Sequence, residues 1–293
     1  MSIFTGSGVA IVTPFKEDKS IDYKAYVKLV NFHLENNTDA IVVCGTTGES
    51  ATLTDEECAN LVKLTVEVVD GKIPVIAGCG SNNTAHAVHL TMQAEALGAN
   101  AIMQVTPYYN KATQRGLIGH FTEIAESTSL PIMLYNVPSR TSCNIAAQTV
   151  AELSKVPNIV CIKEASGDIS QIAEIAKLSE PGFDIYSGND DQVVPLMSLG
   201  GKGVVSVTAN VAPQLMHSMC KEFLEGNVKK SLEIQLKLLD LCKACFIELS
   251  PAPTKAALEM MGYGKAYFRR PICPVSDESL EVIRKALGSY GLI

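Results

Sequence analysis

The sequence predicts an α/β protein, a (β/α)8 TIM barrel with an additional C-terminal helical region. Short apolar runs of strand length recur along the chain, helix-length amphipathic segments lie between them, and the pattern after the last run is helical only. The runs number eight, as a barrel of this kind requires. They lie at residues 8–15, 39–45, 73–79, 101–106, 132–137, 159–165, 184–188 and 203–208.

Amphipathic patterns between the runs predict helices, for example at 23–36, 54–69, 84–97 and 169–177. Thr54 and Asp168 stand where two of these helices begin, and their side chains suit N-caps. A doubly wound open sheet is the rival fold, but it needs a glycine-rich phosphate turn after its first strand. Residues 16–19 read Lys-Glu-Asp-Lys instead, so the barrel is preferred.

The chain after the eighth run predicts four helices, at 211–225, 228–247, 253–261 and 276–290. The first of them completes the barrel. We therefore predict a catalytic barrel domain over 1–225 and a separate helical region over 226–293.

Composition narrows the class of protein. The 293 residues are 47% hydrophobic and 19% charged, which is typical of a globular protein. A net charge of −7 without basic clusters argues against a nucleic-acid partner. No apolar run approaches the roughly 20 residues of a membrane helix. The N-terminus has no secretory signal, and nine scattered cysteines suit a reducing cytoplasm.

Lys163 stands at the end of the apolar run 159–165 and is the first candidate for chemistry. Side chains alternate along a strand, so we expect Ile159, Cys161 and Lys163 to share the face toward the barrel interior. Desolvation there favours the neutral amine, which can attack a carbonyl and form a Schiff base. The ordinary alternative is a lysine that marks a strand end and reaches water.

Other polar side chains end the predicted strands, where barrel enzymes place their catalytic groups. Thr46 shares strand parity with Val42 and Cys44, and Tyr135 with Met133, so both are expected to point inward. Singly, each polar group has an ordinary reading as a turn residue, a rim aromatic or a solvated cation. Together they favour carbonyl chemistry with proton transfer. The group comprises Thr13, residues 46–50, residues 108–110, Tyr135, Asn136, Arg140, Lys163, Glu164, residues 188–190 and Thr208.

Other chemistries find little support in the sequence. Residues 45–50 lack the ending of a P-loop, residues 78–83 fail the dinucleotide fingerprint, and no G-x-S-x-G elbow is present. The lone C-x-x-C at 242–245 and the pair His86 and His89 are weak metal signals. We predict neither a metal nor a cofactor.

Three motifs together resemble those of the class I pyruvate-dependent aldolase (N-acetylneuraminate lyase) family. They are Gly-Thr-Thr-Gly-Glu at 45–49, Tyr-Asn-Val-Pro-Ser-Arg-Thr at 135–141 and Ile-Lys-Glu-Ala at 162–165, and the similarity runs nearly end to end. The resemblance implies a cytoplasmic lyase, independent of metal. Its reaction would be a Schiff-base aldol-type condensation of pyruvate with L-aspartate-4-semialdehyde, in the diaminopimelate route to lysine.

The resemblance also implies roles for individual residues. Lys163 would form the imine, and Tyr135 would be the central acid and base, linked in a relay to Thr46 and to Tyr109 of a neighbouring subunit. Arg140 would hold the semialdehyde carboxylate. The pyruvate end would be held by Thr47 and the backbone at Gly188 and Val207. The implied assembly is a homotetramer, a dimer of dimers.

An inhibitory lysine site is a further implication of the resemblance. Its positions are Ser50, Ala51, Leu53, Asn82, His86 and Tyr108. Sensitive enterobacterial-type members add two histidines and a glutamate, where this chain has Asp55, Cys58 and His86. Loss of the glutamate removes a partner for the lysine α-ammonium, so we predict weak or absent inhibition by lysine.

Two alternatives stay open at this point. A related lyase that cleaves a sugar acid to pyruvate would share Lys163 and Tyr135 without needing Arg140. A non-catalytic member would use the barrel only as a ligand-binding scaffold, and the intact set Lys163, Tyr135, Thr46 and Arg140 argues against it.

Overall fold

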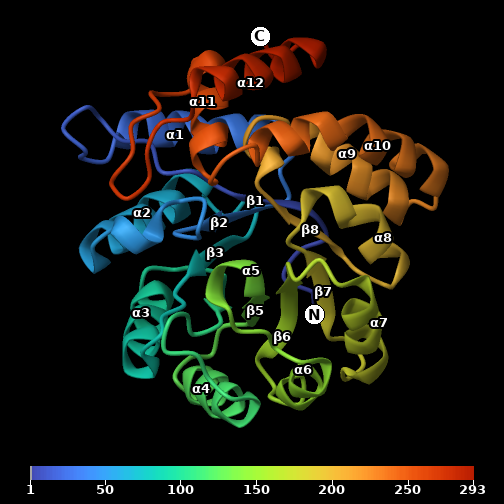
Figure 1. Ribbon diagram of the computed structural model, residues 1–293. Helices are drawn as coiled ribbons and strands as arrows, with labels where there is room; N and C mark the ends of the chain where they lie inside the picture. The colour runs from blue at the N-terminus through green and yellow to red at the C-terminus, as the bar shows by residue number, and fades with distance from the viewer. Residues whose placement is uncertain (1) are drawn as a thin grey trace.

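The computed structural model describes residues 2–293 and has at its centre a closed barrel of eight parallel strands in chain order (Figure 1). Each strand pairs with the next, and the last pairs with the first. The predicted barrel is thus confirmed. The strands are β1 (Gly6–Ala10), β2 (Ala40–Val43), β3 (Val75–Gly78), β4 (Ala101–Val105), β5 (Ile132–Asn136), β6 (Ile159–Glu164), β7 (Asp184–Ser187) and β8 (Gly203–Ser206).

Helices surround the barrel and connect its strands (Figure 1). The main ones are α1 (Tyr23–Glu35), α2 (Asp55–Val69), α3 (Thr84–Ala96), α4 (Gln114–Glu126), α6 (Ala147–Leu153), α7 (Ile169–Leu178), α8 (Val193–Ser198) and α9 (Pro213–Leu224). A single turn, α5 (Pro138–Thr141), follows β5 directly.

The core has two layers because each strand is buried on both faces. Along β2, Val42 belongs to the inner cluster within the barrel, whereas Ile41 and Val43 belong to the outer cluster between strands and helices. Such burial explains why the strands read as continuous apolar runs rather than as alternating ones.

Two predictions about strands need correction. The first strand is Gly6–Ala10 rather than 8–15, because the N–H of Val12 already donates to the side chain of Asn210 instead of to a neighbouring strand. On β6, Ile159 packs in the outer cluster, apart from Cys161, which faces inward. The cause is a register shift between β5 and β6: Ile132 is paired with Ile159, but Met133 with Cys161.

Both predicted N-caps are confirmed. The hydroxyl of Thr54 accepts from the N–H of Glu57, whose carboxylate accepts in turn from the N–H of Thr54, which makes a complete capping box at the start of α2. The Asp168 carboxylate accepts from the N–H of Gln171 at the start of α7.

The C-terminal region consists of α10 (Val228–Cys245), α11 (Ala252–Met260) and α12 (Asp277–Ser289), as the helical pattern predicts. In Figure 1 these orange and red helices lie beside α9 and α1. Helix α10 packs against α9, and the segment after α11 reaches α1, where the Tyr263 and Phe32 rings lie 4.4 Å apart. The region is therefore anchored to both ends of the barrel sequence.

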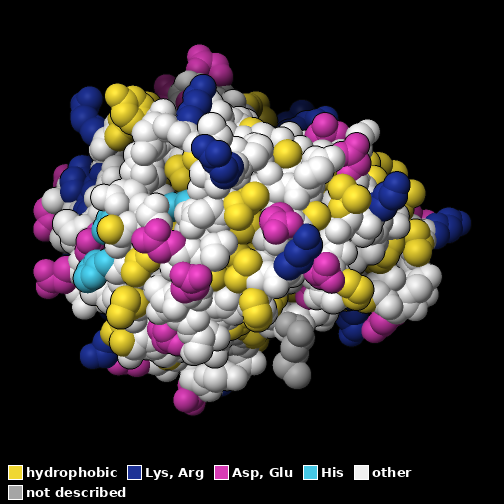
Figure 2. Space-filling model, turned by 90° about the horizontal axis from the view of Figure 1, so that it is seen from below, with side chains coloured by type: hydrophobic (Ala, Val, Ile, Leu, Met, Phe, Trp, Pro, Cys, Tyr) yellow, Lys and Arg dark blue, Asp and Glu magenta, His cyan; other side chains and the backbone are white. Residues whose placement is uncertain are grey.

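The surface carries mixed charge. On the face shown in Figure 2, Lys and Arg side chains lie among Asp and Glu side chains rather than gathering into a basic patch. Within residues 2–293, no helix combines the length and the apolar character needed to cross a membrane.

Candidate active site

Lys163 lies near the carboxyl end of β6, inside the barrel, and its residue is only 4% exposed. Strand pairing sets Lys163 directly beside Tyr135 of β5. The Lys163 Nζ lies 4.2 Å from the centroid of the Tyr135 ring. The predicted nucleophile and the predicted acid and base therefore meet, in a place that water scarcely reaches.

Gly188, after β7, leaves the space that Lys163 occupies. A Cβ at this position would lie 3.1 Å from Lys163 Cε and 2.6 Å from the Cβ of Ala165. Any side chain at 188 would therefore push against the reactive amine or its neighbour. The need for glycine here is steric, and no unusual backbone conformation is involved.

Asp190 is a buried carboxyl group that the sequence places at a strand end without a role. Its Oδ2 accepts from the N–H groups of Val207 and Thr208, at 3.1 and 2.7 Å, and from the Thr208 hydroxyl at 2.7 Å. Its Oδ1 has no partner within residues 2–293. Burial raises the pKa of Asp190, and the hydrogen bonds and the charge of Lys163 oppose that rise. The carboxyl group fixes the turn after β8 in place.

The predicted pyruvate-binding backbone groups are already partly engaged. The N–H of Gly188 donates to the carbonyl of Glu164 at 2.7 Å, and the N–H of Val207 donates to Asp190. In contrast, the N–H groups of Thr46 and Thr47 donate no hydrogen bond to any part of the chain that the structure describes. Successive backbone N–H groups without an acceptor in the chain are donors that can bind an anion.

The turn that bears Thr46 and Thr47 leaves β2 abruptly. Cys44 adopts a left-handed conformation with φ of 57° and packs in the outer cluster. The predicted parity of Thr46 with Cys44 is therefore wrong, because the strand ends at Val43 and the chain turns. Thr46 is nevertheless exposed toward a cavity, and Thr47 is buried.

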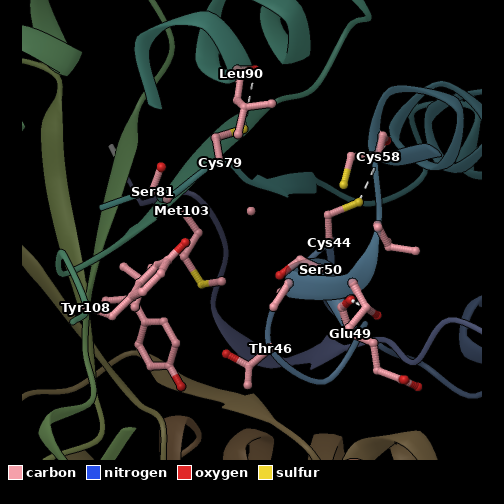
Figure 3. Close-up of a pocket in the computed structure, with 18 of the residues that line it drawn as sticks. Cys44, Thr46, Glu49, Ser50, Cys58, Cys79, Ser81, Leu90, Met103 and Tyr108 are labelled. Atoms are coloured by element: carbon pink, nitrogen blue, oxygen red, sulfur yellow. Dashed lines mark hydrogen bonds between the residues drawn. The ribbon is translucent and has the colours of Figure 1, made fainter. Parts of the chain in front are cut away.

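A cavity of about 480 Å³ opens beside these residues (Figure 3). Thr46, Tyr108, Tyr135 and Arg140 are among the residues that line it. The remaining predicted catalytic and substrate-binding residues are not part of its lining, namely Lys163, Thr47, Tyr109, Gly188 and Val207. Lys163 adjoins the cavity through the Tyr135 ring.

Arg140 lies on α5 and is exposed at the cavity. The ion pairs within residues 2–293 do not include its guanidinium group. The loop after α5 is bound to the barrel through Asn136. The Asn136 side chain donates to the buried carboxylate of Glu164 at 2.9 Å and accepts from the N–H of Ile145, in that loop, at 3.0 Å. Burial raises the pKa of Glu164 despite these contacts.

Tyr109 stands apart from the other predicted residues. The residue is 92% exposed, and its φ of 67° is left-handed. Within this chain it therefore takes no part in the arrangement around Lys163.

Five of the six residues predicted for a lysine site line one cavity. Ser50, Ala51, Leu53, His86 and Tyr108 line the same cavity, whereas Asn82 does not. The His86 ring is engaged on both sides. Its Nε2 lies 3.0 Å from an oxygen of Asp55, and its Nδ1 lies 3.2 Å from the hydroxyl of Ser81. The prediction of weak inhibition remains a prediction.

Two residues with contacts near the site were not predicted from the sequence. Lys255 and Arg269 come from the C-terminal region and contact the loop that follows β2. The signal for Lys255 is a single charge within the apolar stretch Ala252–Leu258, all of which is buried.

A (β/α)8 barrel with a buried lysine on its sixth strand, set against a tyrosine at the mouth, is of the class suited to imine chemistry on a small carbonyl compound. Comparisons with known proteins narrow the class. The model of the dihydrodipicolinate synthetase family matches residues 3–289, and the chain belongs to this family.

Relatives match the chain over its whole length. It is 53% identical to 4-hydroxy-tetrahydrodipicolinate synthase of Caldicellulosiruptor saccharolyticus over 292 residues, covering 100% of this chain and 99% of the relative. The crystal structure of dihydrodipicolinate synthase from Thermotoga maritima superimposes with a TM-score of 0.98 at 46% identity, covering 100% of both chains. DHDPS from Cyanidioschyzon merolae with lysine bound gives a TM-score of 0.97 at 40% identity, again covering 100% of both chains.

Proposed function

We propose that this protein condenses pyruvate with L-aspartate-4-semialdehyde to give 4-hydroxy-tetrahydrodipicolinate, in the diaminopimelate route to lysine. Full-length relatives that carry the synthase name support the reaction. The observation that carries the proposal is Lys163, a residue only 4% exposed, whose Nζ lies 4.2 Å from the Tyr135 ring centroid at the barrel mouth.

The chemistry begins at Lys163. Its neutral amine adds to the C2 carbonyl of pyruvate to give a carbinolamine. Tyr135, acting as acid, protonates the departing hydroxyl group, so that water leaves and a protonated imine forms. Removal of a methyl proton makes an enamine, whose carbon forms the new bond to the aldehyde of the second substrate. Attack by the amine of that substrate on the imine carbon closes the ring and frees Lys163, so one water is lost overall.

Pyruvate is held by the turn after β2. Its carboxylate fits the free N–H groups of Thr46 and Thr47, supplemented by the Thr47 hydroxyl. The N–H groups of Gly188 and Val207 are engaged within the chain, and the Val207 carbonyl already accepts from the N–H and the side-chain amide of Asn210. Of these four backbone groups, the carbonyl oxygen of Gly188 is therefore the one left to contact substrate.

Protons pass through hydroxyl groups. Tyr135 lies between Lys163 and the cavity, and Thr46 lines the same cavity. A phenol is neutral near pH 7 yet passes protons along hydrogen bonds, so it can serve as acid and as base in turn. Tyr109, from a neighbouring subunit, completes the relay.

Arg140 binds the carboxylate of the semialdehyde. Its guanidinium group has no ion-pair partner within residues 2–293 and faces the cavity, and its planar fork matches a carboxylate. A lyase for sugar acids would have no need of this group.

The assembly and the location belong to the same proposal. We place Tyr109 in a homotetramer, since its side chain is 92% exposed, although one structural neighbour with a TM-score of 0.98 is a monomeric dihydrodipicolinate synthase variant. Nine free cysteines support the cytoplasm. The boundary between the barrel and the helical region is set at Gly226.

The proposal is tested by supplying both substrates and following NADPH consumption through a coupled reductase. Replacement Lys163→Ala should reduce kcat by a factor of about 10³ or more, because the imine cannot form. Borohydride should trap pyruvate on the parent and not on Lys163→Ala. Turnover that persists in Lys163→Ala would refute the mechanism.

Acceptor choice is tested at Arg140. Arg140→Ala should spare borohydride trapping of pyruvate and raise KM for the semialdehyde, since only the second substrate loses a partner. If the parent protein does not condense the two substrates but releases pyruvate from a sugar acid, the result would favour the lyase.

A further inference from the structure

A buried ion pair joins the C-terminal region to the loop after β2. Lys255 Nζ of α11 lies 2.6 Å from Glu49 Oε1, and the two side chains are 2% and 0% exposed. The same ammonium group donates to the carbonyl of Tyr267 at 2.6 Å and lies 4.3 Å from the ring centroid of Phe15. Burial lowers the pKa of Lys255 to about 8, because its removal from water outweighs the attraction of Glu49. Stability alone accounts poorly for such a pair, since desolvation offsets most of its attraction.

Glu49 is the end of the turn that carries Thr46 and Thr47. Its N–H donates to the carbonyl of Thr46 at 3.1 Å, and its φ of 57° is left-handed, which is unfavourable for a residue with a Cβ. The surrounding structure must therefore hold this conformation. The side chain of Glu49 is fixed by Lys255, and the carbonyl of Gly48 accepts from the Thr13 hydroxyl at 2.7 Å.

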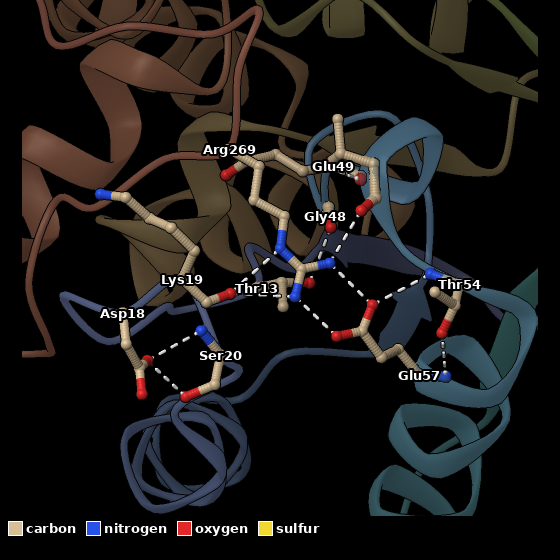
Figure 4. Close-up of polar contacts among 10 residues, drawn as sticks. Thr13, Asp18, Lys19, Ser20, Gly48, Glu49, Thr54, Glu57 and Arg269 are labelled. Carbon is tan, nitrogen blue, oxygen red and sulfur yellow. Dashed lines mark hydrogen bonds and ion pairs between the residues drawn. The ribbon is translucent and has the colours of Figure 1, made fainter.

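A second contact from the C-terminal region holds the far end of the same loop (Figure 4). Arg269 binds the Glu57 carboxylate through two nitrogens, at 2.6 and 2.7 Å. It also donates to the carbonyl of Thr52 at 2.7 Å. Arg269 thus contacts the loop at Thr52, and Lys255 contacts it at Glu49. We expect these two contacts to restrict the conformation of the loop residues between Glu49 and Thr52.

We propose that Lys255 is a positioning residue for the reaction: through Glu49 it fixes the turn whose N–H groups, at Thr46 and Thr47, receive the pyruvate carboxylate. The inference rests on the proposed function for the roles of these two threonines. It makes the C-terminal helical region part of the framework of the active site. A pair with a merely structural role would alter melting and leave kcat and KM of the folded enzyme unchanged.

The variants are chosen to separate positioning from folding. Lys255→Met alone leaves the Glu49 carboxylate buried without a partner and is expected to melt early. The double variant Glu49→Gln with Lys255→Met carries neutral side chains of similar size and avoids that unpaired charge. The control is Lys265→Met, which removes an exposed ion pair with Glu259 from the same region, the two side chains being 68% and 38% exposed.

We expect the folded double variant still to be trapped by borohydride with pyruvate, because Lys163 is untouched. Its KM for pyruvate should rise and its kcat should fall by about tenfold or more, as small displacements of binding groups do. The Lys265→Met control should behave as the parent. A folded double variant with parental kcat and KM would overturn the proposal.

Amide hydrogen exchange provides a readout that needs no turnover. Peptides covering residues 45–53 should exchange faster in the double variant than in Lys265→Met. Unchanged exchange would also overturn the proposal. A parent enzyme without condensation activity would count against the proposed function, whereas the exchange result would still decide whether Lys255 holds the loop.

Discussion

The surroundings of Lys163 suit a cation that forms during the reaction. In the proposed mechanism a positive charge forms on the Lys163 nitrogen when the protonated imine forms, and that nitrogen lies 4.2 Å from the centroid of the Tyr135 ring. A ring face attracts such a charge, more strongly where water is excluded. The charge of Lys163 also acts on the buried Asp190, so the carboxyl group and the amine interact. If Lys163 forms the proposed imine, the Tyr135 ring and the Asp190 carboxyl group would therefore stabilise the charge of that intermediate.

Gly188→Ala tests how closely the reactive amine is packed. The new Cβ would lie 2.6 Å from the Ala165 Cβ and 3.1 Å from Lys163 Cε, so the Lys163 side chain or the strand must shift. We expect borohydride trapping of pyruvate to slow by about tenfold or more, because a misplaced nucleophile loses its geometry. Trapping rates measured at saturating pyruvate give the result directly.

Gly119→Ala in α4 is the matched control for that substitution. A Cβ there meets nothing within 4 Å, and alanine favours a helix by up to about 1 kcal/mol relative to glycine. This variant should be as active as the parent and no less stable. Equal trapping rates for Gly188→Ala and Gly119→Ala would contradict the steric argument.

At the scale of elements, the sequence was a good guide wherever local pattern decides structure. Continuous apolar runs predicted every strand, and Thr54 and Asp168 were predicted as caps that the structure confirms. Errors arose where one residue changes the register. The inward face predicted for Ile159 was wrong because the pairing shifts beside it, and the turn at Cys44 broke the parity predicted for Thr46.

Contacts between distant segments could not be predicted in this way. Lys255 pairs with a carboxylate 206 residues away, and Arg269 with one 212 residues away. Neither pairing produces a periodic or spacing pattern in the sequence. The paired residues become neighbours only in the folded chain, where the C-terminal region lies beside the loop after β2. The roles of Lys163 and Tyr135 came from their positions and from the family resemblance, and their adjacency came from β5 and β6 pairing.

Helix α1 carries a histidine that should make stability depend on pH. His33 is buried, its Nδ1 lies 3.0 Å from the Thr38 hydroxyl, and burial lowers its pKa from 6.5 to about 3. Between these values the unfolded chain binds a proton that the folded chain does not. The free energy of unfolding should therefore fall as pH drops from 6.5 toward 3, by up to about 1.4 kcal/mol per pH unit from this group.

His33→Gln removes this titratable group. The free energy of unfolding of the variant should therefore depend less on pH below 6.5, although it should be lower than that of the parent at pH 7. Urea unfolding at pH 7, 5.5 and 4.5 measures the slope. His89→Gln serves as control, because His89 is exposed on α3 and should leave the slope unchanged. His120 is also buried, with its pKa lowered to about 4, so some slope should remain in every variant. Identical slopes for the parent and His33→Gln would contradict the assignment.

At the scale of the whole molecule, Tyr109 lies apart from the other members of the proposed proton relay. Tyr135 and Thr46 line the cavity, but Tyr109 is 92% exposed in a left-handed turn. An aromatic side chain so exposed suits an interface with a second copy of the chain. In a two-fold dimer each subunit would donate its Tyr109 to the other and receive one in return.

Mixed dimers test whether Tyr109 acts on the neighbouring subunit. Tyr109→Phe and Lys163→Ala should each be nearly inactive alone. In a mixed dimer the subunit that keeps Lys163 receives an intact Tyr109 from its partner, so one site is complete. Random pairing of equal amounts should restore about a quarter of the parental activity, because half of the dimers are mixed and half of their sites are whole.

The control mixes Tyr135→Phe with Lys163→Ala. Each of these substitutions disables the site of the subunit that carries it, so that no mixed dimer contains a complete site. Coexpression followed by the coupled assay measures both pairs. Equal, negligible activity in the two mixtures would show that Tyr109 does not cross the interface, and the relay would then have to be built from one chain alone.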